Sequence, residues 1–234
     1  MKLRINDLVL VQGMRDTRAT LSDWNRRPGL IAGRWAASAL AVAVVLLLTV
    51  WAVAALSTPD AGLVILPGLD GSATLGDAGN VLFRNSLVLA LHAFACLAGF
   101  IAGSSLPQTA QQYSGAWRWI HDKAGPLAIA FVIGATTFSL VTQAYVLGGA
   151  TASLAAQLDI SPGLLLLGLL PHALPELTAL FLPLAAWMIA SRAGNWHQLL
   201  AATVVTVALA APVLVVSALV EVYVSPQLLL ELAR

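Results

Sequence analysis

The sequence is poor in cysteine and in charged residues, and both shortages restrict what the protein can be. Cys96 is the only cysteine, which excludes an intramolecular disulfide and any metal or redox motif that needs two cysteines. Charged residues make up 10% of the chain and hydrophobic residues 59%. A soluble domain has about 25% charged residues and roughly 45–50% apolar residues. The net charge of +1 creates no basic field that would favour nucleic acid as a partner. The composition therefore favours a membrane domain over a soluble enzyme.

Long apolar stretches predict an all-α, polytopic transmembrane helix bundle with about five spans, because a spanning helix needs roughly 18 or more apolar residues. The first stretch exceeds the apolar core of a signal peptide, which has about 7–15 residues, so we expect a membrane anchor. A sixth span depends on whether residues 163–170 cross or re-enter the membrane. The predicted spans cover residues 35–59, 85–106, 126–150, 163–190 and 199–222.

Residues 1–34 are expected to form a cytoplasmic amphipathic segment ahead of a transmembrane domain at residues 35–234. Arg15, Arg18, Arg26 and Arg27 stand opposite an apolar face, which is typical of a helix that lies on an anionic membrane surface. The apolar face consists of Leu8, Val11, Met14, Leu21 and Trp24.

The distribution of lysine and arginine predicts the orientation. Basic residues cluster before the first span, whereas only Arg84 lies between the first and second spans. Because basic loops stay in the cytoplasm, we expect a multi-pass protein of the cytoplasmic (inner) membrane. Its N-terminus should lie in the cytoplasm and its C-terminus outside, with the lipid bilayer as its first partner.

Polar residues inside the apolar spans are the candidates for function, because they are costly in hydrocarbon and usually face protein. Helical spacing places three groups of them on faces rich in small residues, and Gly99 and Gly103 form a pair that allows close helix packing. These faces predict one polar cluster in the outer half of the membrane. Its expected members are His92, Gln143, His172, Glu176 and Glu221, with Arg84 and Asn85 at the mouth of the second span.

The strongest local feature is the segment from Pro171 to Glu176. His172 and Glu176 are four residues apart and therefore share one side of a helix. Pro175 has no N–H group and clashes with the preceding turn, so we expect the fourth segment to be kinked or re-entrant at this point. Pro171 and Pro175 are also expected to shape the packing of this helix.

Three interpretations of the cluster remain open at this stage. His172, Glu176, Glu221 and His92 offer enough ligands for zinc or another divalent cation. Buried carboxylates in a broken span are also typical of transporters. The third interpretation is structural, with the polar groups pairing to hold helices together. The sequence identifies no cofactor and no complete catalytic group, so we expect none of either.

Three segments resemble the stage II sporulation protein M family of integral membrane proteins. His172, Glu176, Glu221 and Pro226 match the family pattern by position, as does Asn85 more weakly. Ala173 stands where the family has glycine, and Gln143 and Ala144 stand where it has Asn-Gly. The segments are FRNSLVLALHAFACLAGFIAG at 83–103, LPHALPELTALFLPLAAWMIASRAG at 170–194 and SALVEVYVSPQL at 217–228.

The resemblance implies a non-enzymatic membrane scaffold or accessory subunit that recruits or anchors partner proteins, because the sporulation member anchors cell-wall hydrolases. The same resemblance implies a protein partner. A homo-oligomer is the alternative, because Gly99 and Gly103 could pack within one chain or between two. Two alternatives are kept beside it. One is a transporter or export-system component with a buried His/Glu site, and the other is an intramembrane metal-dependent enzyme.

Overall fold

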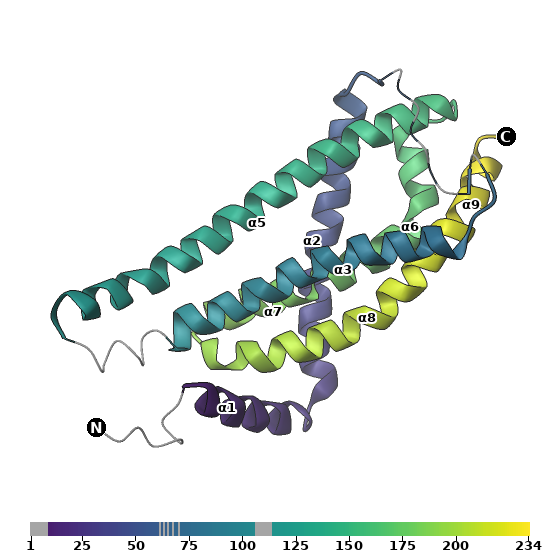
Figure 1. The fold of residues 1–234 in the computed structure, drawn as a ribbon. Coiled ribbons are helices and arrows are strands. Elements are labelled where there is room, and N and C mark those ends of the chain that lie inside the picture. Colours follow the sequence, from purple (N-terminus) through teal and green to yellow (C-terminus); the bar gives the residue numbers. More distant parts are fainter. Residues whose placement is uncertain are drawn as a thin grey trace. The chain divides into compact units, whose positions relative to one another are not determined.

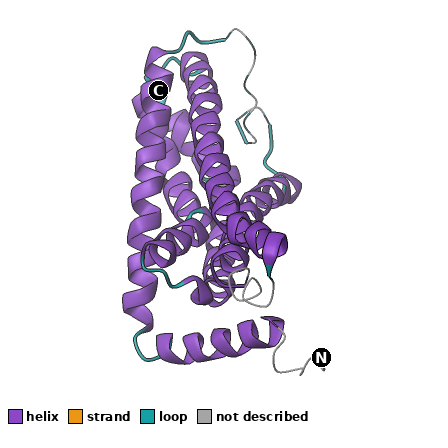
Figure 2. Ribbon diagram, turned by 90° about the vertical axis from the view of Figure 1, so that its left-hand side faces the viewer, coloured by secondary structure: helices purple, strands orange, loops and turns teal. Residues whose placement is uncertain are grey.

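The computed structural model describes residues 9–60, 62, 64, 66, 68–69, 71–105 and 114–234, and this part of the chain contains helices and loops but no strand (Figure 2). Five of the described helical stretches are long and apolar enough to cross a membrane, which confirms the predicted all-α fold. The elements are α1 (Val9–Trp24), α2 (Pro28–Leu56), α3 (Leu75–Phe100), the π-helical turn η2 (Ile101–Ser105), α5 (Gly115–Gln157), α6 (Pro162–Leu180), α7 (Leu182–Arg192), the 3-10 turn η3 (Trp196–Gln198), α8 (Leu199–Tyr223) and α9 (Ser225–Leu232) (Figure 1).

The chain divides into two compact units. Unit 1 comprises Met1–Ser38, Leu89–Ala135 and Leu182–Leu209. Unit 2 comprises Ala39–Val88, Thr136–Phe181 and Ala210–Arg234. One boundary falls between α6 and α7. The others fall inside α2, α3, α5 and α8, so each of these four helices contributes to both units.

In unit 1, Gly99 of α3 and Gly103 of η2 allow large indole rings to approach the backbone. A Cβ atom added at Gly99 would lie 2.7 Å from Trp187 Nε1, and one added at Gly103 would clash with the ring of Trp196. One turn before Gly99, the Cys96 thiol donates a hydrogen bond to the Pro183 carbonyl at 3.0 Å. The two glycines therefore pack against tryptophan side chains of α7 and η3 rather than against another glycine stripe.

Within unit 1, the N-terminal helix α1 packs through residues outside the apolar face that the sequence pattern predicts. Gly13 is buried, and a Cβ atom there would lie 3.0 Å from the Phe100 ring. Thr20, two turns later, is also buried, whereas Met14 is 66% exposed. Helix α1 therefore presents small residues to protein and leaves Met14 on its outer side. Of the expected apolar face, Leu8 and the side chain of Val11 lie outside the described residues.

The core of unit 2 joins the end of α5, the start of α6 and helix α9. Leu154, Ala155, Leu165 and Leu229 form its buried cluster. Side chains of the connection between α2 and α3 pack on this cluster, namely Val64, Leu66 and Leu69. The same connection is fixed to α5 by the Asp60 N–H group, which donates to Ser153 Oγ at 3.0 Å.

The fourth segment is interrupted, but not at Pro175 as expected. Helix α6 continues through both Pro171 and Pro175 and ends at Leu180. Phe181 forms a single-residue break with φ −89° and ψ 0°, and α7 starts at Leu182. The break lies here because Pro183 has no N–H group for the Ala179 carbonyl, and its ring clashes with that carbonyl. The prediction of a broken fourth segment is thus confirmed, with its position moved by more than one turn.

Candidate functional site: an intramembrane polar cluster

Helix α6 places two polar side chains on one side of unit 2. Ser161 caps the helix, and its hydroxyl accepts a hydrogen bond from the Leu164 N–H group at 3.2 Å. The unbroken helix that follows carries His172 and Glu176 one turn apart, as their spacing of four predicts. His172 is buried and Glu176 is half-buried.

His172 contacts the start of α9. Its Nδ1 atom lies 2.6 Å from Ser225 Oγ, and Ser225 is fully buried. The Ser225 hydroxyl is also 3.3 Å from the Val220 carbonyl in α8. If it donates to that carbonyl, the His172 Nδ1–H group donates to Ser225. This contact therefore ties α6 to the junction between α8 and α9.

Glu176 and Glu221 bring two carboxyl groups close enough to repel each other. Each also has a neighbour from α3: Asn85 lies beside Glu176, and Arg84 attracts Glu221. Asn85 Nδ2 and Glu176 Oε2 are buried, yet neither forms a hydrogen bond of ordinary geometry with another described group. The cluster thus joins α3, α6 and α8 while leaving one donor and one acceptor available, which is costly in an apolar interior.

The carboxyl groups face a cavity of about 270 Å³ in unit 2. Its polar lining comes from His172, Glu176, Glu221 and Thr151, and the rest of the wall is mostly leucine and valine. A cation or a proton held between the two carboxyl groups would remove their repulsion. The arrangement can therefore hold helices together and can also accept a small cationic ligand.

The structure does not bring all predicted site residues into this cavity. Gln143 donates through Nε2 to Ser139 Oγ of its own helix at 3.0 Å, and it does not line the cavity. His92 is buried and belongs to unit 1. Arg84, Asn85, His172, Glu176 and Glu221 all belong to unit 2.

The described residues contain no group of three or more His, Cys, Asp or Glu side chains placed to hold a metal ion. His172, the best expected ligand, is engaged with Ser225 instead. The metal hypothesis for His172, Glu176, Glu221 and His92 therefore gains no support from the arrangement of these side chains.

Ser225 is the site residue that the sequence analysis missed. The signal was present, because Ser217, Glu221 and Ser225 follow one another at steps of four and share one helix face. The predicted fifth span stopped at residue 222, so its face was not followed into the next turn. Pro226 occupies one of the first positions of α9, where proline is favoured, and this marks Ser225 as a helix start.

One comparison with known proteins identifies the family. The model of the family described as "Stage II sporulation protein M" matches residues 39–226. The chain belongs to this family. The match covers every residue of the polar cluster in unit 2 and confirms the resemblance drawn from the three segments. No curated protein and no solved structure matches the chain. The family match and the five apolar helices together support a multi-pass membrane protein.

Proposed function

We propose that this family member is a non-enzymatic membrane scaffold or accessory subunit that recruits a partner protein within the bilayer of the cytoplasmic membrane. The observation that carries the proposal is the exposure of α5. Only 6% of the most apolar stretch of this span is buried, against 28% to 39% in the other four. Within the described part of the chain, the third span therefore offers an apolar surface that few other residues cover.

One side of α5 has the form of a helix-docking stripe. Phe131 is 75% exposed, Phe138 73% and Tyr145 73%, and Gly134 and Val141 fall between them at steps of three and four. A Cβ atom added at Gly134 would meet nothing within 4 Å. A glycine notch between large side chains allows a second transmembrane helix to approach closely. The occupant we propose for this stripe is a transmembrane helix of a different protein.

The test is photocrosslinking from single positions in the membranes of the native host. A photoreactive residue at Phe131, Phe138 or Tyr145 is expected to give one discrete protein adduct. Positions Val45 and Leu48 of α2 are matched controls, because they are apolar and are 63% and 58% exposed. These two controls should crosslink to lipid only.

A substitution in the notch makes the test specific. Gly134→Leu fills the docking stripe at a position where an added Cβ atom meets no described atom within 4 Å, so the adduct should be lost while expression and folding are kept. Gly79→Leu is the control, because a Cβ atom at Gly79 also meets nothing within 4 Å. An identical adduct pattern from α2 and α5 contradicts recruitment. An adduct with the mass of two copies of this chain assigns the stripe to self-association instead.

A second candidate function is a transporter or export-system component. The specific observation in its favour is that Glu176 and Glu221 line one cavity in unit 2, where they could bind a cation or carry a proton. Flux of protons or monovalent cations into proteoliposomes measures this activity. Flux that is unchanged in the Glu176→Gln, Glu221→Gln double variant counts against transport through this site.

A further inference from the structure

A second cavity, of about 360 Å³, lies entirely within unit 1. One part of its wall comes from the end of α1 and the start of α2, and another from α7, η3 and the start of α8. The family match begins at residue 39, so the α1–α2 part of the wall lies outside the region that the family shares. No residue of this cavity belongs to the polar cluster in unit 2.

Two tryptophans build the wall on the α1–α2 side. Trp24 ends α1, and Trp35 lies near the start of α2 and is buried. Their ring centroids are 5.0 Å apart and their planes meet at 80°, which is a favourable edge-to-face contact. The pair fixes the last turn of α1 against α2, and indoles are typical of the region where membrane proteins meet lipid headgroups.

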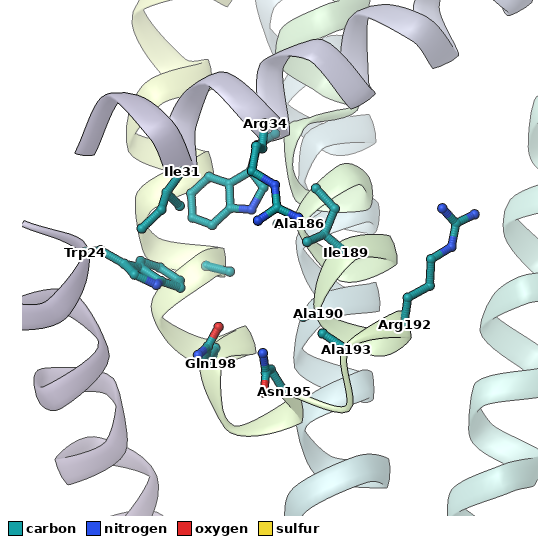
Figure 3. Close-up of a pocket in the computed structure, with 12 residues that line it drawn as sticks. Trp24, Ile31, Arg34, Ala186, Ile189, Ala190, Arg192, Ala193, Asn195 and Gln198 are labelled. Carbon is teal, nitrogen blue, oxygen red and sulfur yellow. The ribbon is translucent and has the colours of Figure 1, made fainter. Parts of the chain in front are cut away.

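The polar side of the cavity consists of donor side chains. Arg34, Asn195 and Gln198 surround the space, while the Arg192 side chain lines its rim and turns outward (Figure 3). Among the described residues, neither arginine forms an ion pair or a hydrogen bond. The side chain of Asn195 does not cap η3, and Gln198 also has no side-chain hydrogen bond in the described part.

These four side chains are suited to a phosphate group. A guanidinium group binds phosphate oxygens with paired N–H donors, and amide groups add neutral donors. The remaining wall is apolar, with Ile31, Ile189 and Ala186 beside the donors (Figure 3). A ligand with a phosphate and an attached hydrocarbon chain satisfies both parts of the cavity.

We propose that this cavity binds the phosphate headgroup of an anionic phospholipid, with Arg34 as the main contact and Arg192 as a second contact at the rim. Anionic lipid is abundant in the leaflet that attracts basic segments. Bound lipid would connect α1 to α7 and η3 within unit 1. This site would hold the N-terminal helix on the bundle as part of the membrane surface.

The experiment is native mass spectrometry of the purified full chain in detergent, titrated with phosphatidylglycerol and, separately, with phosphatidylcholine. The wild type should retain phosphatidylglycerol preferentially. Arg34→Gln should weaken that binding about tenfold, as expected for the loss of one charge-assisted contact, and Arg192→Gln should weaken it less. Arg27→Gln is the matched control, because Arg27 is exposed, lies near the same helix start and does not line the cavity. Its affinity should stay within about twofold of the wild type.

Three outcomes would overturn the proposal. Equal losses in Arg27→Gln and Arg34→Gln would show general surface attraction rather than a site. Equal retention of both lipids by the wild type would remove the anionic preference. Displacement of phosphatidylglycerol by glycerol phosphate at similar concentrations would assign the cavity to a soluble phosphate. The melting temperature of each variant is measured as a control for folding. It should stay close to that of the wild type, because the three arginines are exposed.

Discussion

Each unit has a cavity among the described residues, and the charged side chains in the walls of these two cavities have opposite sign. In unit 2, Glu176 and Glu221 are coupled to partners on α3. In unit 1, Arg34 and Arg192 have no partner among the described residues. Inside an apolar span, polar groups must find partners in the protein because hydrocarbon supplies none. Charges at helix ends can remain unpaired, and they are then available to a ligand.

The largest effect on stability should come from the contact between α6 and α9. His172→Ala removes a buried ring and its contact with the Ser225 hydroxyl, so the free energy of unfolding should fall by about 2–4 kcal/mol. Unfolding in mixed micelles, followed by circular dichroism, measures it. Gln143→Ala should cost less than about 1 kcal/mol, because among the described residues the Gln143 side chain bonds to Ser139 of its own helix and not to another helix.

A double-mutant cycle tests whether the contact between α6 and α9 itself stabilises the fold, unlike the contact of Gln143 within its own helix. His172→Ala and Ser225→Ala should be non-additive by about 1 kcal/mol or more, because the two side chains share one contact. Additive losses would show that the 2.6 Å contact contributes little to stability.

A smaller effect on the free energy of unfolding should distinguish Glu176 from Glu221. Measured at pH 9, Glu176→Gln removes the repulsion from Glu221 and keeps an amide beside Asn85. Glu221→Gln removes the same repulsion but also the attraction to Arg84. The first variant should therefore be more stable than the second by about 1 kcal/mol. The same micelle unfolding experiment decides this, and a reversed order would contradict the assigned neighbours.

The smallest effect on stability should come from the arginines of unit 1. In lipid-free detergent, Arg34→Gln should change the free energy of unfolding by less than about 0.5 kcal/mol, because an exposed, unpaired side chain contributes little to folding. With phosphatidylglycerol added, the wild type should gain stability by mass action and the variant should not. A large loss without lipid would instead make Arg34 a structural residue of unit 1.

Most of the fold could be predicted because hydrocarbon imposes a simple length requirement. The five apolar stretches appear as helices long enough to cross a membrane, although their ends differ and the fourth stretch is interrupted at Phe181. Helix α2 begins at Pro28 rather than at Trp35, because an arginine such as Arg34 can extend its charge away from an apolar helix surface. A run of apolar residues predicts that a span is present, but it does not predict how far the helix continues beyond that run.

The parts that could not be predicted depend on contacts between helices. Both Pro175 and Pro183 can interrupt a helix, and the sequence offered no reason to choose Pro183. The partnership of His172 with Ser225 requires α9 to fold back on α6, which no local pattern shows. His172, Glu176 and Glu221 line one cavity, and each lies on a helix face marked by small residues, but that these residues form a functional site stays a prediction.

The most direct test of the account compares partner crosslinking in two variants. A photoreactive residue at Phe138 is introduced into the Gly134→Leu background and, separately, into the Glu176→Gln, Glu221→Gln background. A scaffold that recruits its partner through α5 predicts that the protein adduct disappears in the first and persists in the second. An adduct that persists in Gly134→Leu and disappears in the double variant would contradict this account and place the function at the acidic cavity.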